Sequence, residues 1–245
     1  MAQSKSITSW FKLARLGAHL GEGFVLGTAS GALFFPHKPF QQPVVKFWHR
    51  RLCKILGLTI KVSGQVPDKR PALWVSNHIS WLDIPVIGAN FPVHFLSKAE
   101  VEAWPVVGRL AKAGGTLYIK RGSGDSKSVA KQMAEHLQAG RSVLFFPEGT
   151  TTDGTSLKRF FHHLFHAACV TGTDIQPVVL RYKDKEGNIH AVAPFIGDDE
   201  FSDHLFKVIQ EQHIQVELKV LPRVSVYGKD ERRLAKELQA MMTAA

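Results

Sequence analysis

The chain has 245 residues, of which 44% are hydrophobic, and it carries a formal net charge of +10. This length accommodates one α/β domain with a sizeable core, and the charge favours an anionic partner such as nucleic acid, an acidic membrane or a phosphorylated substrate. The two cysteines, Cys53 and Cys169, lie far apart and form no C-x-x-C, which argues against a disulfide framework and a zinc site. A reducing, cytosolic setting fits this usage best.

Residues 1–57 are predicted to form a helical region that binds a membrane surface. Polar and mostly basic residues recur there at spacings of three and four, namely Lys5, Thr8, Lys12, Arg15, His19 and Glu22. Trp10 and Phe11 lie on another side, and a basic amphipathic helix with such aromatic residues suits the bilayer interface. Residues 44–57 repeat this theme. The alternative is a pair of helices that pack on the domain with a solvated basic face.

A membrane-spanning helix is less consistent with the same segment. Residues 23–35 are uncharged, but this run is too short to cross a bilayer. A tilted span that starts near Leu16 would have to include His19 and Glu22. The residues that interrupt the apolar pattern also argue against an ordinary signal peptide.

Residues 58–245 are predicted to form an α/β domain with a mixed, largely parallel sheet flanked by helices. Extended apolar runs occupy residues 58–64, 72–77, 93–98, 115–121, 142–149, 175–182, 189–195 and 214–221. Helices are expected at 126–139 and, near the end of the chain, at 230–242. This alternation is typical of a sheet covered by helices. Pro177 suggests that the run at 175–182 is an edge strand or is bent.

The segment "WVSNHISWLDIP" (residues 74–85) brings an imidazole and a carboxylate to the end of a strand. Trp74 and Val75 complete an apolar run, and Pro85 fits only the first turn of a following helix. The helix therefore begins near Asp83, and His78 lies on the strand-to-helix turn. In open α/β sheets this edge is where ligands bind.

A purely structural interpretation of the same turn is also open. Asp83 fits the role of a helix N-cap, and "SWLD", from Ser80 to Asp83, matches a capping box. The His78 ring can be satisfied by a backbone carbonyl. The rest of the chain has to decide between these interpretations.

Two further strand ends carry unusual residues. The segment "GGTLYIKRG" (residues 114–122) ends its strand with Lys120 and Arg121, and "LFFPEGTTTDG" (residues 144–154) places Glu148 after a buried strand. A charged strand end is usually just solvated, so each feature alone is weak. Glu148, which follows an apolar run and a proline, is the less ordinary of the two.

Four blocks together resemble the glycerolipid acyltransferases related to 1-acylglycerol-3-phosphate acyltransferase. "NHISWLD" matches the N-H-x-x-x-x-D motif of that family, and "GTLYIKR", "FPEGT" and "IQPVVLRY" resemble its later blocks in the family's order. "LSKAEV" (residues 96–101) is also similar to the family's segment between the first two blocks. A lone N-H-x-x-x-x-D is weak evidence, whereas four ordered blocks are strong evidence.

The resemblance implies transfer of a fatty acyl group from a thioester, on coenzyme A or acyl carrier protein, to a lipid hydroxyl. In that reaction a neutral imidazole acts as the base, so His78 and Asp83 are the implied catalytic pair, as in a Ser-His-Asp triad without the serine. No cofactor beyond the acyl donor and no metal is implied. The implied substrate-binding residues are Asn77, Ser80, Lys98, Gly115, Arg121, Glu148, Gly149 and Thr150. Among them, Glu148 and Gly149 would shape the acceptor site, and Arg121, with Lys98 as the weaker candidate, would bind an anionic headgroup.

One departure bears on the acceptor. Many family members have an arginine after Glu-Gly-Thr, whereas this chain has Thr151. The family's later F-K-x-G pattern is also absent. Lysophosphatidic acid is retained as the leading acceptor, with another lysolipid such as lyso-ornithine lipid as the alternative. The expected location is the cytoplasmic face of the inner or plasma membrane.

Competing functions have less support. Nucleic-acid binding is disfavoured because no helix-turn-helix, RNA-recognition or zinc-finger pattern accompanies the positive charge. A metal site at His162, His163 and His166 lacks an obvious further ligand. An inactive lipid-binding member of the family is the main non-enzyme alternative, and the intact His78 and Asp83 argue against it.

Overall fold

The structure is a computed structural model that describes residues 2–120 and 126–245. It contains one sheet with the order β1-β7-β6-β2-β5-β3-β4. The strands are β1 (Leu58–Gly64), β2 (Leu73–Ser76), β3 (His94–Lys98), β4 (Leu117–Ile119), β5 (Val143–Phe145), β6 (Ile175–Lys183) and β7 (Ile214–Val220). All neighbouring pairs are parallel except β6 and β7. The prediction of a mixed, largely parallel sheet is confirmed.

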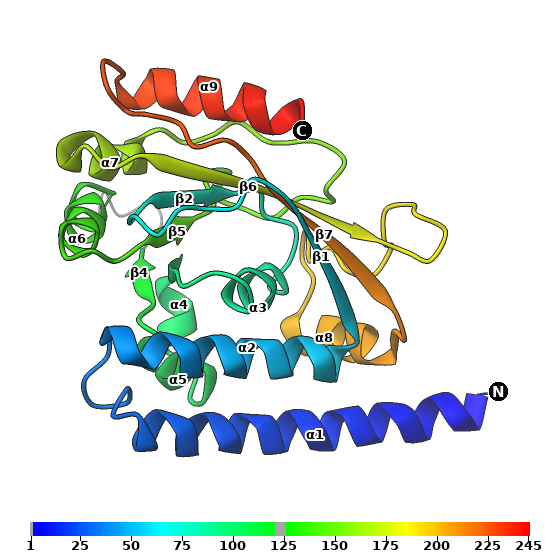
Figure 1. Cartoon of the computed structure of the whole chain (residues 1–245). Helices are drawn as coiled ribbons and strands as arrows, with labels where there is room; N and C mark the ends of the chain where they lie inside the picture. Colours follow the sequence, from blue (N-terminus) through cyan, green and yellow to red (C-terminus); the bar gives the residue numbers. More distant parts are fainter. Residues whose placement is uncertain (1, 121–125) are drawn as a thin grey trace.

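Helices cover both faces of this sheet (Figure 1). They are α1 (Ala2–Ala29), α2 (Gln42–Leu56), α3 (Asp83–Gly88), α4 (Ala99–Glu102), α5 (Val107–Ala113), α6 (Ser126–Gln138), α7 (His166–Thr171), α8 (Phe201–Gln210) and α9 (Glu231–Thr243), with 3-10 turns η1 (Pro39–Gln41) and η2 (His163–Phe165). The helices expected at 126–139 and 230–242 are thus confirmed as α6 and α9 to within a residue or two at each end.

Alternating side chains of the strands pack into two hydrophobic cores, one on each face of the sheet. Trp74 in β2 packs into the core shared with α2, α3 and α8, whereas its neighbours Leu73 and Val75 pack into the core shared with α6, α7 and α9. Because both faces are buried, the central strands read as continuous apolar runs in the sequence. The five parallel strands carry their carboxyl ends to one edge of the sheet, and the turn after β2 lies at that edge.

One predicted strand is absent, and the edge position considered for another is wrong, while the bend considered for that strand remains a prediction. The run at 189–195 forms no strand; Ile189 makes one isolated bridge with Lys183, and the His190 ring accepts the N–H groups of Val192 and Ala193 at 3.1 and 3.2 Å. This local bonding turns the chain away from the sheet. The strand that contains Pro177 is not at an edge, since β6 lies between β7 and β2. Its ladder with β7 begins only at Val178, so the missing N–H of the proline does not interrupt that ladder.

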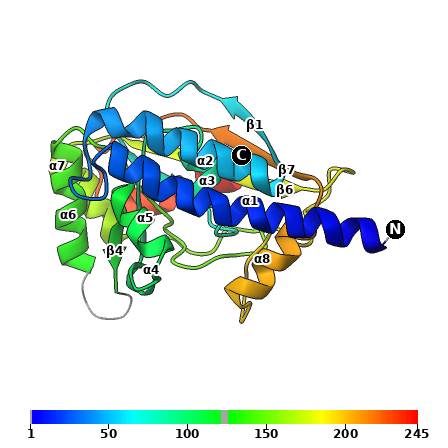
Figure 2. The same cartoon turned by 90° about the horizontal axis from the view of Figure 1, so that it is seen from below.

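The N-terminal helices α1 and α2 form a hairpin that lies along one side of the body (Figure 2). The His19 ring is stacked on Trp48 at a centroid distance of 4.5 Å, and Lys12 donates to the carbonyl of Glu211 at 2.6 Å. The polar stripe of α1 therefore faces the body at these positions, which differs from an outward basic face. His19 is buried and has almost no contact with bulk solvent.

The opposite side of the hairpin is rich in exposed aromatic residues. Trp10, Phe11, Phe34, Phe35 and Phe40 each have about two thirds or more of their surface exposed, with values between 65% and 70%. Among the residues for which the structure gives a position, no helix is both long enough and apolar enough to cross a bilayer. The division of the chain at residue 57 remains a prediction.

Candidate active site

The turn after β2 is fastened to the sheet by Asn77. Its side-chain amide donates to the Leu180 carbonyl at 3.0 Å, and its side-chain oxygen accepts from the Leu180 N–H at 2.8 Å. Asn77 is buried, so these two bonds satisfy both ends of the amide. The residue after Asn77 consequently leaves the sheet at a fixed place beside β6.

His78 and Asp83 are in direct contact, as the sequence predicts. Nδ1 of His78 lies 2.7 Å from Oδ2 of Asp83, and the Asp83 side chain is completely buried. The same oxygen accepts the backbone N–H groups of Ile79 at 2.8 Å and Ser80 at 3.1 Å. Asp83 is not the N-cap, since α3 begins at Asp83 and its N-cap is Leu82, without a side-chain cap. The Asp83 carboxylate does accept the Ser80 N–H, as the acid of a capping box would, and the same oxygen holds the imidazole.

The other side of the His78 ring is available. The ring is stacked on Phe146, with centroids 3.9 Å apart and planes at 12°. The His78 side chain is 17% exposed, and Nε2 makes no hydrogen bond with any residue that the structure describes. With Nδ1 donating to Asp83, Nε2 is left as the acceptor of a proton.

Glu148 holds the backbone of this turn. One carboxylate oxygen accepts the His78 N–H at 2.9 Å and the other accepts the Lys158 N–H at 2.7 Å. Only 2% of Glu148 is exposed, and burial raises the pKa of its carboxyl group. The Thr152 N–H also donates to the His78 carbonyl at 2.8 Å. Glu148 therefore acts on the position of His78 through the main chain, a geometry that the sequence did not reveal.

Tyr182 is part of the site and was missed by the sequence analysis. Its hydroxyl donates to Oδ1 of Asp83 at 2.7 Å, although the two residues are 99 positions apart. Leu180, two residues earlier in β6, is the partner of Asn77. Because alternate residues of a strand share a face, Tyr182 follows Leu180 toward the turn. That periodicity was the available signal, but it required knowing that β6 lies next to β2.

The remaining predicted site residues do not all gather around His78. Ser80 is fully buried beside Asp83, Gly149 has a φ of +67°, and Thr150 is exposed on the loop after β5. Lys98 is exposed at the carboxyl end of β3, on the same edge of the sheet as His78. Arg121 lies outside the described residues.

Gly115 occupies the opposite edge of the sheet, before the amino end of β4. Its φ is +83°, and a Cβ atom there would lie 2.3 Å from Nδ1 of His94 and 2.8 Å from Nδ1 of His37. The close approach of these rings and the left-handed backbone explain the glycine. The structure therefore does not bring Gly115 together with His78.

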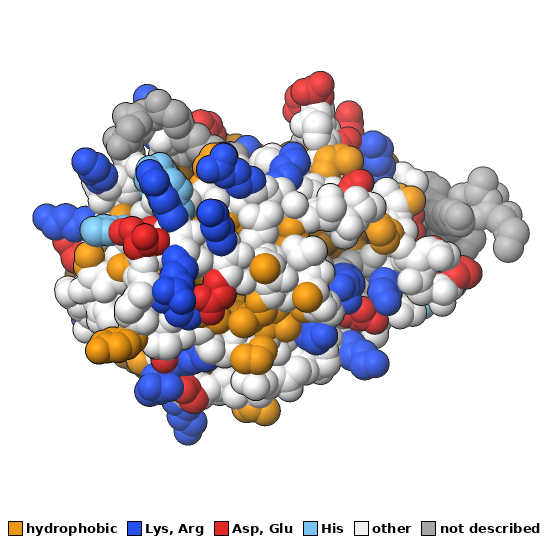
Figure 3. Space-filling model, turned by 90° about the horizontal axis from the view of Figure 1, so that it is seen from above, with side chains coloured by type: hydrophobic (Ala, Val, Ile, Leu, Met, Phe, Trp, Pro, Cys, Tyr) orange, Lys and Arg blue, Asp and Glu red, His pale blue; other side chains and the backbone are white. Residues whose placement is uncertain are grey.

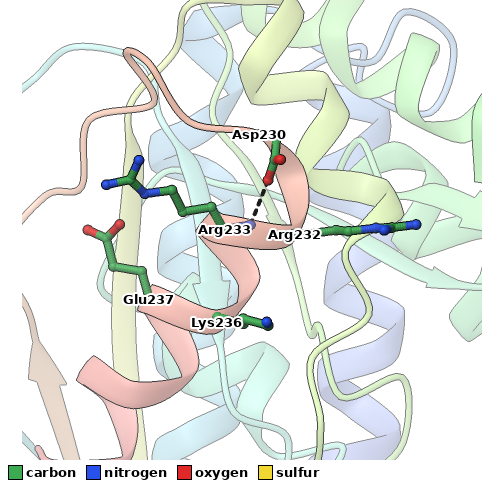
Figure 4. Close-up of a pocket in the computed structure, with 5 residues that line it drawn as sticks. All are labelled: Asp230, Arg232, Arg233, Lys236 and Glu237. Carbon is green, nitrogen blue, oxygen red and sulfur yellow. Dashed lines mark hydrogen bonds between the residues drawn. The ribbon is translucent and has the colours of Figure 1, made fainter.

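The surface hollows do not by themselves identify the site. A hollow of about 560 Å³ is lined by α9 residues and its N-cap Asp230, and it contains none of the residues above. Arg232 and Lys236 point to one side of α9, and Arg233 and Glu237 to the other (Figure 4). A cavity of about 260 Å³ does adjoin the turn with His78, since Ile79 and Tyr182 help to line it. Of the three histidines considered for a metal, His166 is paired with Glu231 at 2.7 Å.

Comparisons with known proteins point to one family of enzymes. A family model described as Acyltransferase matches residues 59–181. A lyso-ornithine lipid O-acyltransferase of Pseudomonas aeruginosa is 44% identical over 84% of this chain and 80% of that protein. A 1-acyl-sn-glycerol-3-phosphate acyltransferase of Neisseria gonorrhoeae is 29% identical over 74% of this chain and 72% of that protein.

A solved structure has the same fold. The crystal structure of the 1-acyl-sn-glycerophosphate acyltransferase of Thermotoga maritima superposes with a TM-score of 0.74 at 17% identity, covering 99% of this chain and 95% of that one. The family model spans the turn with His78, the Glu148 loop and most of β6, which are the parts that build the site. The chain therefore belongs to the acyltransferase family.

Proposed function

We propose that the protein transfers a fatty acyl group from an acyl thioester to the free hydroxyl group of lyso-ornithine lipid. The observation that carries this proposal is the contact between His78 and the buried Asp83, which leaves Nε2 of the imidazole open. A hydroxyl group becomes a good nucleophile when a positioned base removes its proton. Nε2 of His78 is the nitrogen that can accept this proton.

His78 acts first as a base and then as an acid. Nε2 of His78 takes the proton of the lipid hydroxyl as its oxygen attacks the thioester carbonyl carbon. The tetrahedral intermediate collapses when the carbon–sulfur bond breaks, and the imidazolium returns the proton to the leaving thiolate. Asp83 fixes the tautomer and stabilises the imidazolium between these steps. The substrate supplies the nucleophile, so no enzyme-bound acyl intermediate and no cofactor beyond the acyl donor is needed.

The choice of acceptor rests on similarity and on Thr151. The relative named for lyso-ornithine lipid is 44% identical, against 29% for the relative named for 1-acylglycerol 3-phosphate. Many family members have an arginine where this chain has Thr151, and a threonine brings no charge to neutralise a phosphate monoester. Lysophosphatidic acid is the second candidate, supported by the relative named for 1-acylglycerol 3-phosphate. Both acyl-coenzyme A and acyl carrier protein are compatible with the proposed chemistry.

The proposal is tested with purified protein, a labelled acyl thioester and a panel of lysolipids. We expect kcat/KM to be higher for lyso-ornithine lipid than for lysophosphatidic acid. A clear preference for lysophosphatidic acid would reassign the acceptor and leave the chemistry in place. No transfer to any lysolipid from either kind of donor would contradict the proposed function.

The hairpin of α1 and α2 is proposed to hold the enzyme on an anionic membrane surface, at the cytoplasmic face of the inner or plasma membrane. Its exposed aromatic residues supply apolar area for insertion, and Arg15 and Arg51 lie 5.8 Å from the rings of Phe11 and Phe47. Positive charge alone does not select this face, since many lysine and arginine side chains also stand on the side of α9 (Figure 3). The exposed aromatic residues distinguish the hairpin from the side of α9.

Vesicle sedimentation tests the membrane proposal. Replacing Phe34 and Phe35 by serine should weaken binding to vesicles that contain acidic lipid, because both rings are exposed and their loss does not disturb the core. Tyr227→Ser is a matched control, since Tyr227 is 92% exposed next to α9. Equal sedimentation of both variants and the unmodified protein would contradict an insertion role for the hairpin.

A further inference from the structure

We propose that Tyr182 is a positioning residue for the transfer reaction, acting through Asp83 to set the orientation of the His78 imidazole and the strength of its hydrogen bond to that carboxylate. This inference rests on the proposed function, in which His78 is the base. Tyr182 does not contact the reacting atoms. Its effect is transmitted by the hydrogen bond between its hydroxyl and Oδ1 of Asp83, which is 2.7 Å long.

The hydrogen bonds of Asp83 are divided unequally between its two oxygens. Oδ2 accepts from Nδ1 of His78 and from the N–H groups of Ile79 and Ser80, whereas Oδ1 accepts only from Tyr182 among the described residues. The carboxylate is completely buried, and none of these donors carries a charge while His78 is neutral. Hydrogen bonds alone therefore stabilise the buried negative charge, and one oxygen depends on Tyr182 entirely.

The position of the tyrosine is fixed by the sheet. β6 pairs with β2 up to the register of Ser76 with Val178, and Asn77 then bonds to both backbone groups of Leu180. Tyr182 is only 2% exposed. Its hydroxyl consequently reaches Asp83 from a rigid element, which is the arrangement expected of a residue that orients another group.

The charged and titratable neighbours of the pair do not replace this bond. Glu148 is the other carboxyl group near His78, and it is occupied by two backbone N–H groups. From α2, Cys53 faces Tyr182, and burial raises the pKa of its thiol to about 12, so it is neutral. Burial and the adjacent Asp83 raise the pKa of Tyr182 well above its ordinary value. The tyrosine is therefore protonated near neutral pH, where its hydroxyl can donate to Asp83.

The hydrogen bond has a predictable chemical consequence. By withdrawing negative charge from Asp83, the Tyr182 hydroxyl weakens the attraction between the carboxylate and the imidazolium. Without the hydroxyl, the carboxylate attracts the imidazolium more strongly. The carboxylate also loses the bond that fixes its plane. The alternative is that the ring of Tyr182 only fills the core.

Tyr182→Phe separates these two roles, because it keeps the ring and removes only the hydroxyl. We expect kcat to fall about tenfold or more, and the acid limb of the kcat/KM profile to move to higher pH. Tyr118→Phe is the matched control: it also removes one tyrosine hydrogen bond, from the hydroxyl to the Gly108 carbonyl at 3.3 Å. If Tyr182→Phe behaves like Tyr118→Phe and keeps its turnover and its pH profile, the proposal is overturned.

A second substitution keeps the proposal testable if Tyr182→Phe folds poorly. Site-specific incorporation of 3-fluorotyrosine at position 182 retains the shape of the ring and makes the hydroxyl a stronger donor. The acid limb should then move to lower pH, opposite to the effect of phenylalanine. An unchanged profile in correctly folded, fluorinated enzyme would contradict the proposal.

Nuclear magnetic resonance of the proton between Nδ1 of His78 and Oδ2 of Asp83 distinguishes failure of this inference from failure of the proposed function. The chemical shift of this proton should differ between Tyr182→Phe and the unmodified protein, whether or not a lysolipid is acylated. A changed chemical shift without any acyl transfer would reject the function and retain the coupling. An unchanged chemical shift with active acyl transfer would reject the coupling and retain the function.

Discussion

The two edges of the sheet place histidines in opposite settings. At the carboxyl edge, His78 has one carboxylate partner, Asp83, and an open Nε2. At the amino edge, His37, His94 and His136 form a three-histidine cluster with ring centroids 4.8–5.6 Å apart. Nδ1 of each ring in this cluster is buried and has no partner among the described residues.

The difference explains why His78, and none of these three histidines, is proposed as the base. Burial and the nearby Arg141 lower the pKa of His94 to about 4 and that of His136 to about 3, so these rings are neutral packing groups. The cluster also ties the hairpin to the body, because His37 lies in the connection between α1 and α2. An imidazole without a carboxylate and without an open nitrogen holds the fold together, whereas one with both can move a proton.

Removing the Asp83 carboxylate at the carboxyl edge should have the largest effect on kcat. Asp83→Asn is expected to lower kcat by about 10²–10⁴-fold, since the amide no longer stabilises the imidazolium and can favour the wrong tautomer. Steady-state rates of the purified variant measure this loss, with Asp198→Asn as a control on an exposed acid. If Asp83→Asn loses thermal stability but keeps its turnover number, capping is the main role of the carboxylate.

Glu148→Gln should have a smaller effect at the same edge. The amide offers one accepting oxygen instead of two, so either the His78 N–H or the Lys158 N–H loses its partner. We expect the free energy of unfolding to fall by about 1–3 kcal/mol and kcat to fall about tenfold. Denaturant unfolding and initial rates measure the two changes. An unaltered kcat at equal folded concentration would show that the clamp does not position His78.

How much of this site was predictable depends on sequence distance. Proline at position 85 and the apolar run before it were enough to place His78 and Asp83 together, because the contact is local. Tyr182 and Glu148 reach the same turn from β6 and the loop after β5, and their places depend on strand order. The inward side of α1 also depends on a distant partner, the carbonyl of Glu211, which helical periodicity cannot identify.

The three-histidine cluster at the amino edge should make the folded protein less stable in acid. The ordinary pKa of histidine is 6.5, and folding lowers it for His94 and His136. Below pH 6.5 the unfolded chain therefore binds more protons than the folded protein does, so stability is complete above that pH and is lost as the pH falls toward 4. The slope is about 1.4 kcal/mol per pH unit for each histidine.

Urea unfolding between pH 7.5 and pH 4.5 measures this slope. His136→Phe should have a shallower pH dependence than the unmodified protein, because one neutral imidazole is gone. An equally steep dependence in this variant would show that the three-histidine cluster does not contribute to acid sensitivity.

The most direct test of the central claim compares one histidine from each edge. Acyl transfer to a lysolipid is measured for His78→Ala and His136→Ala at pH 7.5 and at equal concentrations of folded protein. We predict that His78→Ala loses about 10²–10⁴-fold in turnover, while His136→Ala loses stability and keeps the turnover of its folded fraction. Near-normal turnover of folded His78→Ala would contradict the assignment of His78 as the base.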